Sequence, residues 1–211
     1  MNTLRILTIT FLGIWTTQMT TAQISLGPHA GLAVTNIIGD DSGDTDSKGG
    51  LMFGANALID LGFFVDFQPE ITFIRRGYKQ EGVAFVGDQG TLKANYLEIG
   101  ALVRKGISIG GSSGVHFLFG PQFGLGLGDL NLNIEVPNGQ EQDLDFGYDD
   151  FGTKRSVFSL VFGTGYYYEL SAMQVFADMR YLLGINDIAE GAGEVQQGAF
   201  TLTVGARFPL N

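Results

Sequence analysis

The chain has 211 residues, a length that fits one domain, and a formal net charge of −10. Charged residues make up only 16% while Phe and Tyr are abundant at 17 and 7, so the composition excludes an intrinsically disordered chain. No run of Lys or Arg exceeds two residues. This acidic balance argues against a nucleic-acid-binding protein, because a phosphate backbone has to be met by a concentrated basic surface.

Residues 1–22, MNTLRILTITFLGIWTTQMTTA, have the pattern of a secretory signal peptide. Arg5 precedes the apolar stretch 6–15, and small residues occupy both cleavage-site positions up to Ala22. The apolar stretch is shorter than the roughly 20 residues that a membrane-spanning helix needs. We therefore expect cleavage after Ala22 and an exported domain over residues 23–211, which cannot contain disulfides because the chain has no Cys.

Eight segments of the mature chain alternate apolar and polar residues with period two, as expected of strands with one apolar face. No helical period of comparable strength appears, so the sequence predicts an all-β fold. In chain order the predicted strands are approximately 24–35, 50–61, 64–78, 93–104, 115–127, 156–169, 173–185 and 198–209.

The third segment shows the alternation clearly, with Asp66, Gln68, Glu70 and Thr72 at every second position and apolar residues between most of them. Its Pro69 falls on the apolar face. Because proline has no N–H for a strand ladder, we expect bulges or strand ends at the four prolines predicted to face outward. These are Pro28, Pro69, Pro121 and Pro209.

The connections between these strands alternate in length. Long polar segments, 36–49, 79–92, 128–155 and 186–197, follow every odd-numbered strand, so they all lie at one end of an antiparallel fold. They hold 16 of the 22 Asp and Glu residues. The sequence therefore predicts a barrel with one acidic rim.

Two closed barrels fit this pattern. In a soluble, lipocalin-like barrel the apolar face lines a ligand pocket, and in an outer-membrane barrel it meets lipid. The polar face is rich in Gly and poor in Lys, which suits the interior of an eight-stranded barrel better than a water-facing surface. Strand lengths and loop asymmetry also favour lipid outside. We expect an eight-stranded antiparallel up-and-down transmembrane β-barrel in the outer membrane.

The ordered segments also resemble a known family. GPHAGLAVTN, FQPEITFIRRGYK, NYLEIGALVRKG, FGPQFGLGLG, DFGTKRSVFSLVFGTGYYYEL, FADMRYLLGINDI and FTLTVGARFPL together are similar to the PorT-like outer-membrane β-barrel family of Bacteroidetes, often labelled "porin family protein". The resemblance covers nearly all of the mature chain and implies periplasmic termini. It implies little about activity, although PorT itself is linked to type IX secretion.

The polar face carries the first candidate site, an interior network. Enclosed charges are costly unless they are paired and hydrogen-bonded, so we expect acid–Arg bridges across the lumen. A structural plug and a proton or solute path are both open interpretations, and the plug is favoured because side chains fill a lumen of eight strands. The network is predicted to comprise Asp66, Glu70, Arg76, Glu98, Arg104, Glu169, Asp178, Arg180 and Arg207, with His29, Tyr96, His116 and Gln122 joining them.

The sequence offers two further candidate sites, a lipid-modifying active site and a partner-binding loop. A lipid-modifying enzyme needs a nucleophile or His at the lipid-facing wall, whereas His29 and His116 are predicted to face inward. In the acidic segment 128–155, the aromatic residues Phe146, Tyr148 and Phe151 suggest a partner-binding loop. The acidic loops lack the D-x-D-x-D-G pattern of a calcium site, so we expect no metal and no cofactor.

The sequence thus predicts a monomeric, non-enzymatic outer-membrane protein with a structural, adhesive or accessory role that includes a secretion-associated one. The predicted partners are outer-membrane lipid and membrane or surface proteins, and not nucleic acid. A narrow porin for small solutes is the first alternative, and a lipid-modifying enzyme is the second.

Overall fold

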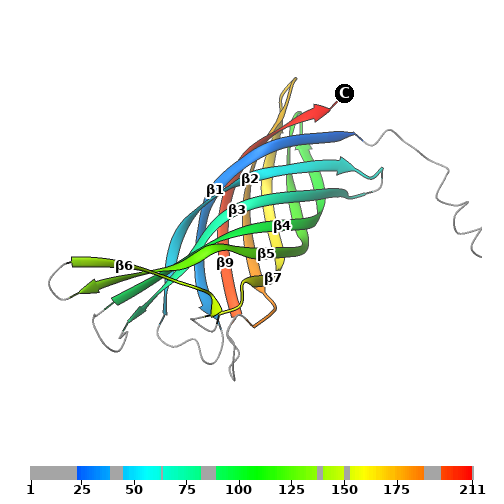
Figure 1. Ribbon diagram of the computed structural model, residues 1–211. Coiled ribbons are helices and arrows are strands. Elements are labelled where there is room, and N and C mark those ends of the chain that lie inside the picture. Colours follow the sequence, from blue (N-terminus) through cyan, green and yellow to red (C-terminus); the bar gives the residue numbers. More distant parts are fainter. Residues whose placement is uncertain are drawn as a thin grey trace, which may run out of the picture.

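The computed structural model of this protein describes residues 23–38, 45–62, 64–81, 89–136, 140–149, 153–187 and 196–210. The predicted signal peptide, residues 1–22, lies outside the described residues. Within the described ranges no helix is long and apolar enough to cross a membrane. The described residues form nine strands, each antiparallel to its neighbours (Figure 1). They are β1 (Ile24–Ile38), β2 (Thr45–Asp60), β3 (Asp66–Glu81), β4 (Gln89–Gly110), β5 (Ser113–Val136), β6 (Gln140–Phe146), β7 (Ser156–Glu169), β8 (Gln174–Gly184) and β9 (Gln196–Leu210).

Eight of the nine strands close into a ring. Hydrogen-bonded neighbours follow the order β4-β3-β2-β1-β9-β8-β7-β5, and the pairing of β4 with β5 joins the two ends. The first and last strands pair along their length, with Ile24 opposite Leu210. Closure leaves no free sheet edge within the ring. The predicted eight-stranded antiparallel up-and-down barrel is therefore confirmed.

Short turns lie at one end of the ring, at residues 61–65, 111–112 and 170–173, and the other connections lie at the opposite end. We call these the turn end and the loop end. Outer-membrane barrels place short turns in the periplasm and long connections outside the cell. The loop end is therefore the cell-surface end of a barrel of this class.

The expectation of a single loop over residues 128–155 is wrong. β5 continues to Val136, and β6 pairs back onto it, with Leu130 opposite Phe146. The loop-end parts of β3, β4 and β5 and the whole of β6 form a sheet that projects past the other strands, and we call it the strand extension (residues 76–81, 89–95, 129–136 and 140–146; Figure 1). The alternation DLNLNIEV continues the strand period through the acidic residues.

The expectation of bulges or strand ends at the prolines is met at Pro209, the penultimate residue of β9, and is wrong at the other three. Pairing continues with an unchanged register across Pro28, Pro69 and Pro121. On the other side of Pro69, the β2–β3 ladder omits the pairs at Ala57 and Leu58 but keeps its register. The ladder thus accommodates a missing N–H by skipping pairs and not by inserting a residue.

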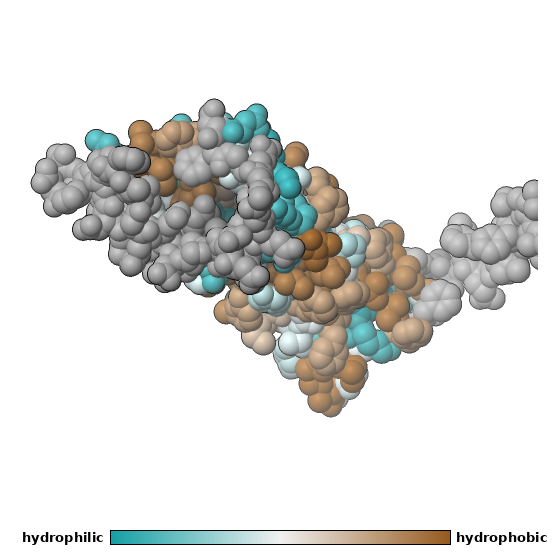
Figure 2. Space-filling model, turned by 90° about the horizontal axis from the view of Figure 1, so that it is seen from below, coloured by the Kyte–Doolittle hydropathy of each residue, from teal (hydrophilic) through white to brown (hydrophobic). Residues whose placement is uncertain are grey.

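The barrel is inside-out relative to a soluble protein. Outward-facing Phe53 and Phe119 are 57% and 51% exposed, whereas the guanidinium of Arg207 is 0% exposed. Figure 2 shows hydrophobic residues over much of the outer surface of the described strands. A lipocalin-like barrel would place these apolar side chains inside. The structure therefore favours lipid, and not water, around the outer face.

On two neighbouring strands the outward face changes from apolar to polar at one level. Toward the loop end, the next residue on the outward face after Phe73 of β3 is Arg75, and the next after Leu97 of β4 is Asn95. Arg75 lies opposite Asn95, and its Nε donates a hydrogen bond to Asn95 Oδ1 over 3.1 Å. This level marks the loop-end boundary of the apolar band.

Candidate functional site

Strand alternation turns four acidic and four basic side chains into the barrel, so their formal charges balance. Several of them lie against glycines that leave room for the side chain, for example Glu70 beside Gly100 and Glu98 beside Gly124. Seven of the eight side chains are buried, and Asp66 is about one-quarter exposed at the turn end. The eight residues are Asp66, Glu70, Glu98, Asp178, Arg76, Arg104, Arg180 and Arg207.

Glu169, the ninth residue predicted for the interior network, lies at its exposed rim and reaches it through Gln174, whose Oε1 accepts a hydrogen bond from Arg207. It is exposed at the end of β7, where Gln174 Nε2 donates to its Oε1 over 2.6 Å. The alternation of side chains along a strand shows which face of the barrel wall a residue is on, but not how deep in the barrel it lies. This position is at the rim of the turn end.

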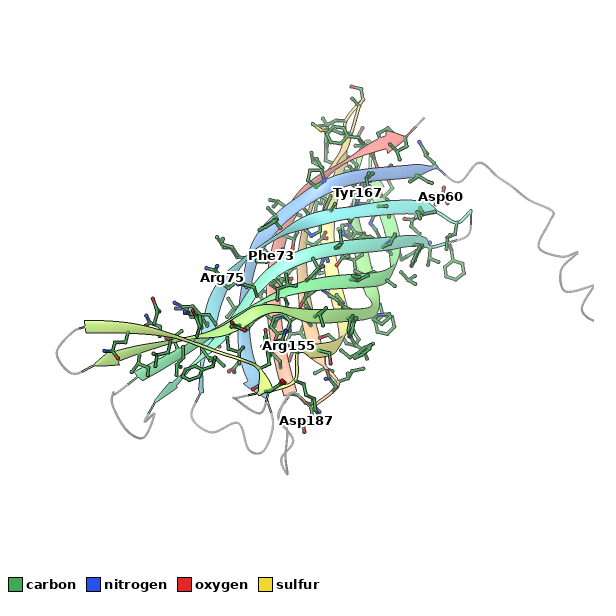
Figure 3. The ribbon with its side chains drawn as sticks, viewed as in Figure 1. Asp60, Phe73, Arg75, Arg155, Tyr167 and Asp187 are labelled. Carbon is green, nitrogen blue, oxygen red and sulfur yellow. The ribbon has the colours of Figure 1, made fainter. Side chains whose placement is uncertain are left out.

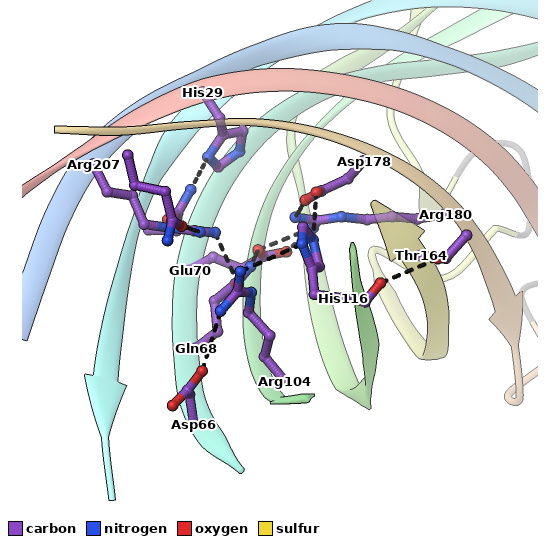
Figure 4. A network of polar contacts seen from close by, with 12 residues as sticks. His29, Asp66, Gln68, Glu70, Arg104, His116, Thr164, Asp178, Arg180 and Arg207 are labelled. Carbon is purple, nitrogen blue, oxygen red and sulfur yellow. Dashed lines mark hydrogen bonds and ion pairs between the residues drawn. The ribbon is translucent and has the colours of Figure 1, made fainter. Parts of the chain in front are cut away.

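Arg180 is the centre of the main network (Figure 4). Its Nη1 donates to both carboxylate oxygens of Glu70, at 2.8 and 3.0 Å, and its Nη2 donates to Asp178 Oδ2 at 2.7 Å. Glu70 and Arg180 are 110 positions apart in the chain. One buried guanidinium therefore bridges two carboxylates that come from distant parts of the sequence.

His116 links Asp178 to a second arginine. Its Nε2 lies 2.7 Å from Asp178 Oδ1, and Arg104 Nη2 lies 3.4 Å from its Nδ1. Because arginine only donates, Nδ1 accepts and Nε2 carries the proton in the neutral ring. Arg104 also donates from Nη1 to Asp66 Oδ2 at 3.1 Å and lies over the ring of Tyr167, 4.9 Å from its centroid.

Arg207 has no carboxylate partner among the described residues. Its three nitrogens donate instead to amide oxygens, namely Nε to Asn56 at 2.5 Å, Nη1 to Gln174 at 2.9 Å and Nη2 to Gln68 at 2.9 Å. The guanidinium also lies over the ring of Phe176, 3.9 Å from its centroid. Amide dipoles and an aromatic face thus stabilise this cation.

Thr72, His29 and Asn56 stand in the order of a nucleophile, base and orienting amide, but their hydrogen bonds run in the opposite direction. Arg207 fixes Asn56 by donating to its Oδ1, so Asn56 Nδ2 donates to His29 Nδ1 over 3.0 Å. His29 Nε2 then carries the proton and donates to Thr72 Oγ1 at 3.0 Å. This nitrogen cannot remove a proton from the hydroxyl in that state, and all three side chains are buried.

A second network lies nearer the loop end. Arg76 Nη2 pairs with Glu98, and its Nη1 donates to Gln197 Oε1 at 2.9 Å. Gln122 donates to the other carboxylate oxygen of Glu98. Arg76 also lies over the ring of Tyr96, 5.7 Å from its centroid.

Two apolar clusters fill interior space beside these networks. The larger lies toward the loop end and joins the barrel wall to the strand extension, and partly buried Ile134 and Phe146 pack against it. Its buried members are Ala33, Met52, Ile74, Leu92, Ala94, Tyr96, Leu130, Leu132, Tyr148 and Val157. The smaller comprises Leu102, Leu118, Val161, Leu182 and Ala199.

Several contributors were not assigned to a network from the sequence. Four amide side chains form hydrogen bonds with the buried arginines or carboxylates, namely those of Asn56, Gln68, Gln174 and Gln197. Inward parity was the available signal for Asn56 and Gln68. Gln197 falls within the predicted connection 186–197, whereas β9 begins at Gln196.

The three aromatic residues of the predicted partner-binding loop separate in the structure. Tyr148 is 0% exposed, and its ring packs so closely over Gly126 that a Cβ there would collide with it. Burial raises the pKa of Tyr148. Phe146 is partly buried against the larger cluster, and Phe151 lies outside the described residues. Tyr148 is therefore a core residue and not an exposed contact.

At the turn end, a cavity of about 540 Å³ opens toward the periplasmic side and meets Arg104 and Arg207 of the main network.

In the described parts of the chain, no group of three or more His, Cys, Asp or Glu residues has metal-binding geometry. Asp143 and Asp145 accept hydrogen bonds from Asn133 and Asn131 at 3.0 and 3.1 Å. The acidic residues 39–44 lie outside the described residues.

Comparisons with known proteins agree with this architecture. Residues 17–190 match the family described as "Outer membrane protein beta-barrel domain". OprG from Pseudomonas aeruginosa has a similar structure, with a TM-score of 0.54 and 11% identity over 90% of this chain and 95% of that chain. At this identity the likeness shows the fold alone.

Two other solved structures align with lower scores. Neisserial surface protein A gives a TM-score of 0.49 and 13% identity over 87% of this chain and 96% of that chain. Ail, the attachment invasion locus protein of Yersinia pestis, gives 0.43 and 16% identity over 88% and 98%. No curated protein sequence matches this chain.

Proposed function

Because the chain belongs to the family of outer membrane protein β-barrel domains, we propose that it is a non-conducting, non-enzymatic barrel that presents its strand extension at the cell surface. Its location is the outer membrane. The role proposed for the extension is structural, adhesive or accessory. Membership of the PorT-like group, with a secretion-associated role, is a narrower form of this proposal and is supported by the ordered segments quoted above.

The filled interior is the observation that carries this proposal. Four buried arginines and their carboxylate and amide partners occupy the lumen beside two apolar clusters. Opening a path would separate charged partners, and removing one member of a buried pair costs about 3–5 kcal/mol. An eight-stranded barrel has only enough interior for its own side chains.

Planar-bilayer recording of the purified barrel tests this interpretation. We expect no steady unit conductance from the wild type. A variant carrying Glu70→Ala, Asp178→Ala and Arg180→Ala removes the centre of the main network and serves as the comparison that conducts. Large, steady conductance of the wild type would overturn the proposal in favour of the narrow porin.

The absence of enzymatic activity is proposed from the geometry of His29. Its proton-bearing nitrogen faces Thr72, and the hydroxyl lies in the buried interior. Mass spectrometry of outer-membrane lipids incubated with the wild type and with Thr72→Val tests this point. We expect identical lipid profiles, and a product that depends on Thr72 would identify a hydrolase or transferase.

The strand extension supports a surface role because β6 is an edge strand that pairs only with β5 among the described residues. Edge strands are ready to pair with other chains. Asp143 and Asp145 place negative charge on the exposed face of the strand extension. Their carboxylates accept hydrogen bonds from Asn133 and Asn131. Cross-linking and co-purification from outer membranes of the wild type and of Asp143→Lys/Asp145→Lys tests the role. A partner set unchanged by the substitution would exclude this face as the contact.

A further inference from the structure

A groove of about 510 Å³ crosses the outward faces of β1, β2 and β3. Its floor includes Gly49 and Gly50, and Arg75 lines one end. The apolar residues that line it are Leu32, Ala33, Val34, Leu51, Phe53 and Phe73. Phe53 and Phe73 stack on each other with ring centroids 5.0 Å apart. The groove is therefore an apolar channel on the lipid-facing wall with a cation at one end.

The two glycines and a register shift explain why the wall is hollow here. The β2–β3 ladder shifts register between Ser47 and Met52. A Cβ on Gly50 would collide with the backbone carbonyl of Arg75, so this position needs glycine. A Cβ on Gly49 would meet nothing within 4 Å. Gly49 thus leaves empty space that the fold itself does not require.

Arg75 stands at the level where the outward face changes from apolar to polar. Figure 3 shows its side chain beside Phe73 on the outside of the barrel. Its Nε donates to Asn95 Oδ1 at 3.1 Å, which orients the guanidinium. Within the described residues, neither terminal nitrogen has a hydrogen bond or an ion pair. The exposed fork is available to an anion at the boundary of the apolar band.

We propose that this groove binds one phosphorylated lipid of the outer leaflet. An acyl chain lies along Phe53 and Phe73, and the phosphate accepts hydrogen bonds from the terminal nitrogens of Arg75. The loop end of an outer-membrane barrel faces the cell exterior, so Arg75 meets the head groups of the outer leaflet. One such lipid matches both parts of the groove, because its acyl chain packs on the apolar side chains and its phosphate pairs with the guanidinium of Arg75.

A second apolar groove on the same barrel provides an internal control. It has a volume of about 690 Å³, lies over β1, β5, β7, β8 and β9, and includes Ala177 and Met179. No Lys or Arg is among its lining residues. It can hold an acyl chain, but it offers no cation to a phosphate. Selectivity for a phosphorylated head group is therefore expected from the first groove alone.

Native mass spectrometry of the delipidated full barrel tests the proposal with two probes, phosphatidic acid and diacylglycerol with identical acyl chains. We expect a one-to-one adduct with phosphatidic acid that is at least tenfold more abundant than the diacylglycerol adduct. Arg75→Gln reduces the apparent affinity for phosphatidic acid about tenfold, since a hydrogen bond to a charged group contributes roughly a factor of ten or more. Arg75→Lys keeps most of the binding.

Matched variants separate the groove from general lipid adhesion. Gly49→Leu fills the open space and reduces binding of phosphatidic acid, whereas Ala177→Leu fills the cation-free groove and leaves it unchanged. Lys105→Gln removes an exposed cation at the turn end and also leaves binding unchanged. Far-UV circular dichroism verifies that each variant is folded.

Three results would overturn the proposal. They are equal binding of both probes by the wild type, full binding of phosphatidic acid by folded Arg75→Gln, and a wild-type dimer that Gly49→Leu disrupts without any lipid adduct. The last result would assign the groove to a second copy of the chain. None of them depends on bilayer conductance, so this test is independent of the proposed function.

Discussion

Replacing Arg180 with methionine is expected to destabilise the barrel more than any other single loss of an interior cation. The change removes three hydrogen bonds, at 2.7, 2.8 and 3.0 Å, and leaves the carboxylates of Glu70 and Asp178 without their shared counter-ion. Removing one partner of a buried pair costs about 3–5 kcal/mol, and two carboxylates are stranded here. We therefore expect a loss near the upper end, about 5 kcal/mol in the free energy of unfolding.

The neutral triple variant Arg180→Met, Glu70→Gln and Asp178→Asn provides the control. Replacing a whole buried ion pair with neutral groups is often tolerated, so most of the lost free energy should return. Urea denaturation in detergent micelles measures the free energy of unfolding of both variants. The signal is circular dichroism or tyrosine fluorescence, since residues 23–211 contain no Trp. A loss under about 1 kcal/mol for Arg180→Met, or a triple variant no more stable than the single one, would refute the assignment of Arg180 as the shared counter-ion.

Three further outcomes are expected from the same denaturation assay. Arg207→Lys loses about 2 kcal/mol, because an ammonium cannot reach three separated amide oxygens, and an unchanged midpoint would contradict this. Gly126→Ala loses about 1–3 kcal/mol through its collision with Tyr148, whereas Gly49→Ala, in open space, has little effect. Burial raises the pKa of Tyr148 from 10.0, so its neutral form stabilises the fold below pH 10 and this contribution is lost as the pH rises toward the folded-state pKa. Tyr148→Phe should reduce that alkaline loss, and an identical pH profile would exclude the effect.

The direction of the interior side chains was predictable because a strand of a closed barrel has only two environments. Asp66, Glu70 and Arg76 follow one parity on β3, and the structure places them on one face. Lipid outside and tight packing inside impose the same period on all eight ring strands.

Which acid meets which arginine was not predictable, because the tilt and stagger of the strands bring distant residues together. Arg180 on β8 reaches Glu70 on β3, although these strands are not neighbours in the sheet. The alternation along a strand also gives no depth, so it does not show that Glu169 lies at the exposed rim. The strand extension was missed because acidic and amide residues in 128–155 were interpreted as a solvated loop, although Leu130 and Leu132 keep the strand period.

The distribution of counter-ions explains why the interior and the wall form one structure. Among the described residues Arg180 has two carboxylate partners and Arg207 has none, so charge balance exists over the whole lumen and not within each pair. Hydrogen bonds continue from Asp178 through Arg180, Glu70 and Gln68 to Arg207, then through Asn56 to His29, and so connect β8, β3, β9, β2 and β1. Widening the lumen would therefore break contacts that hold opposite walls together. Binding activity is better accommodated on the surfaces outside this network, the strand extension and the groove at Arg75, where a side chain can change its partner without separating buried charges.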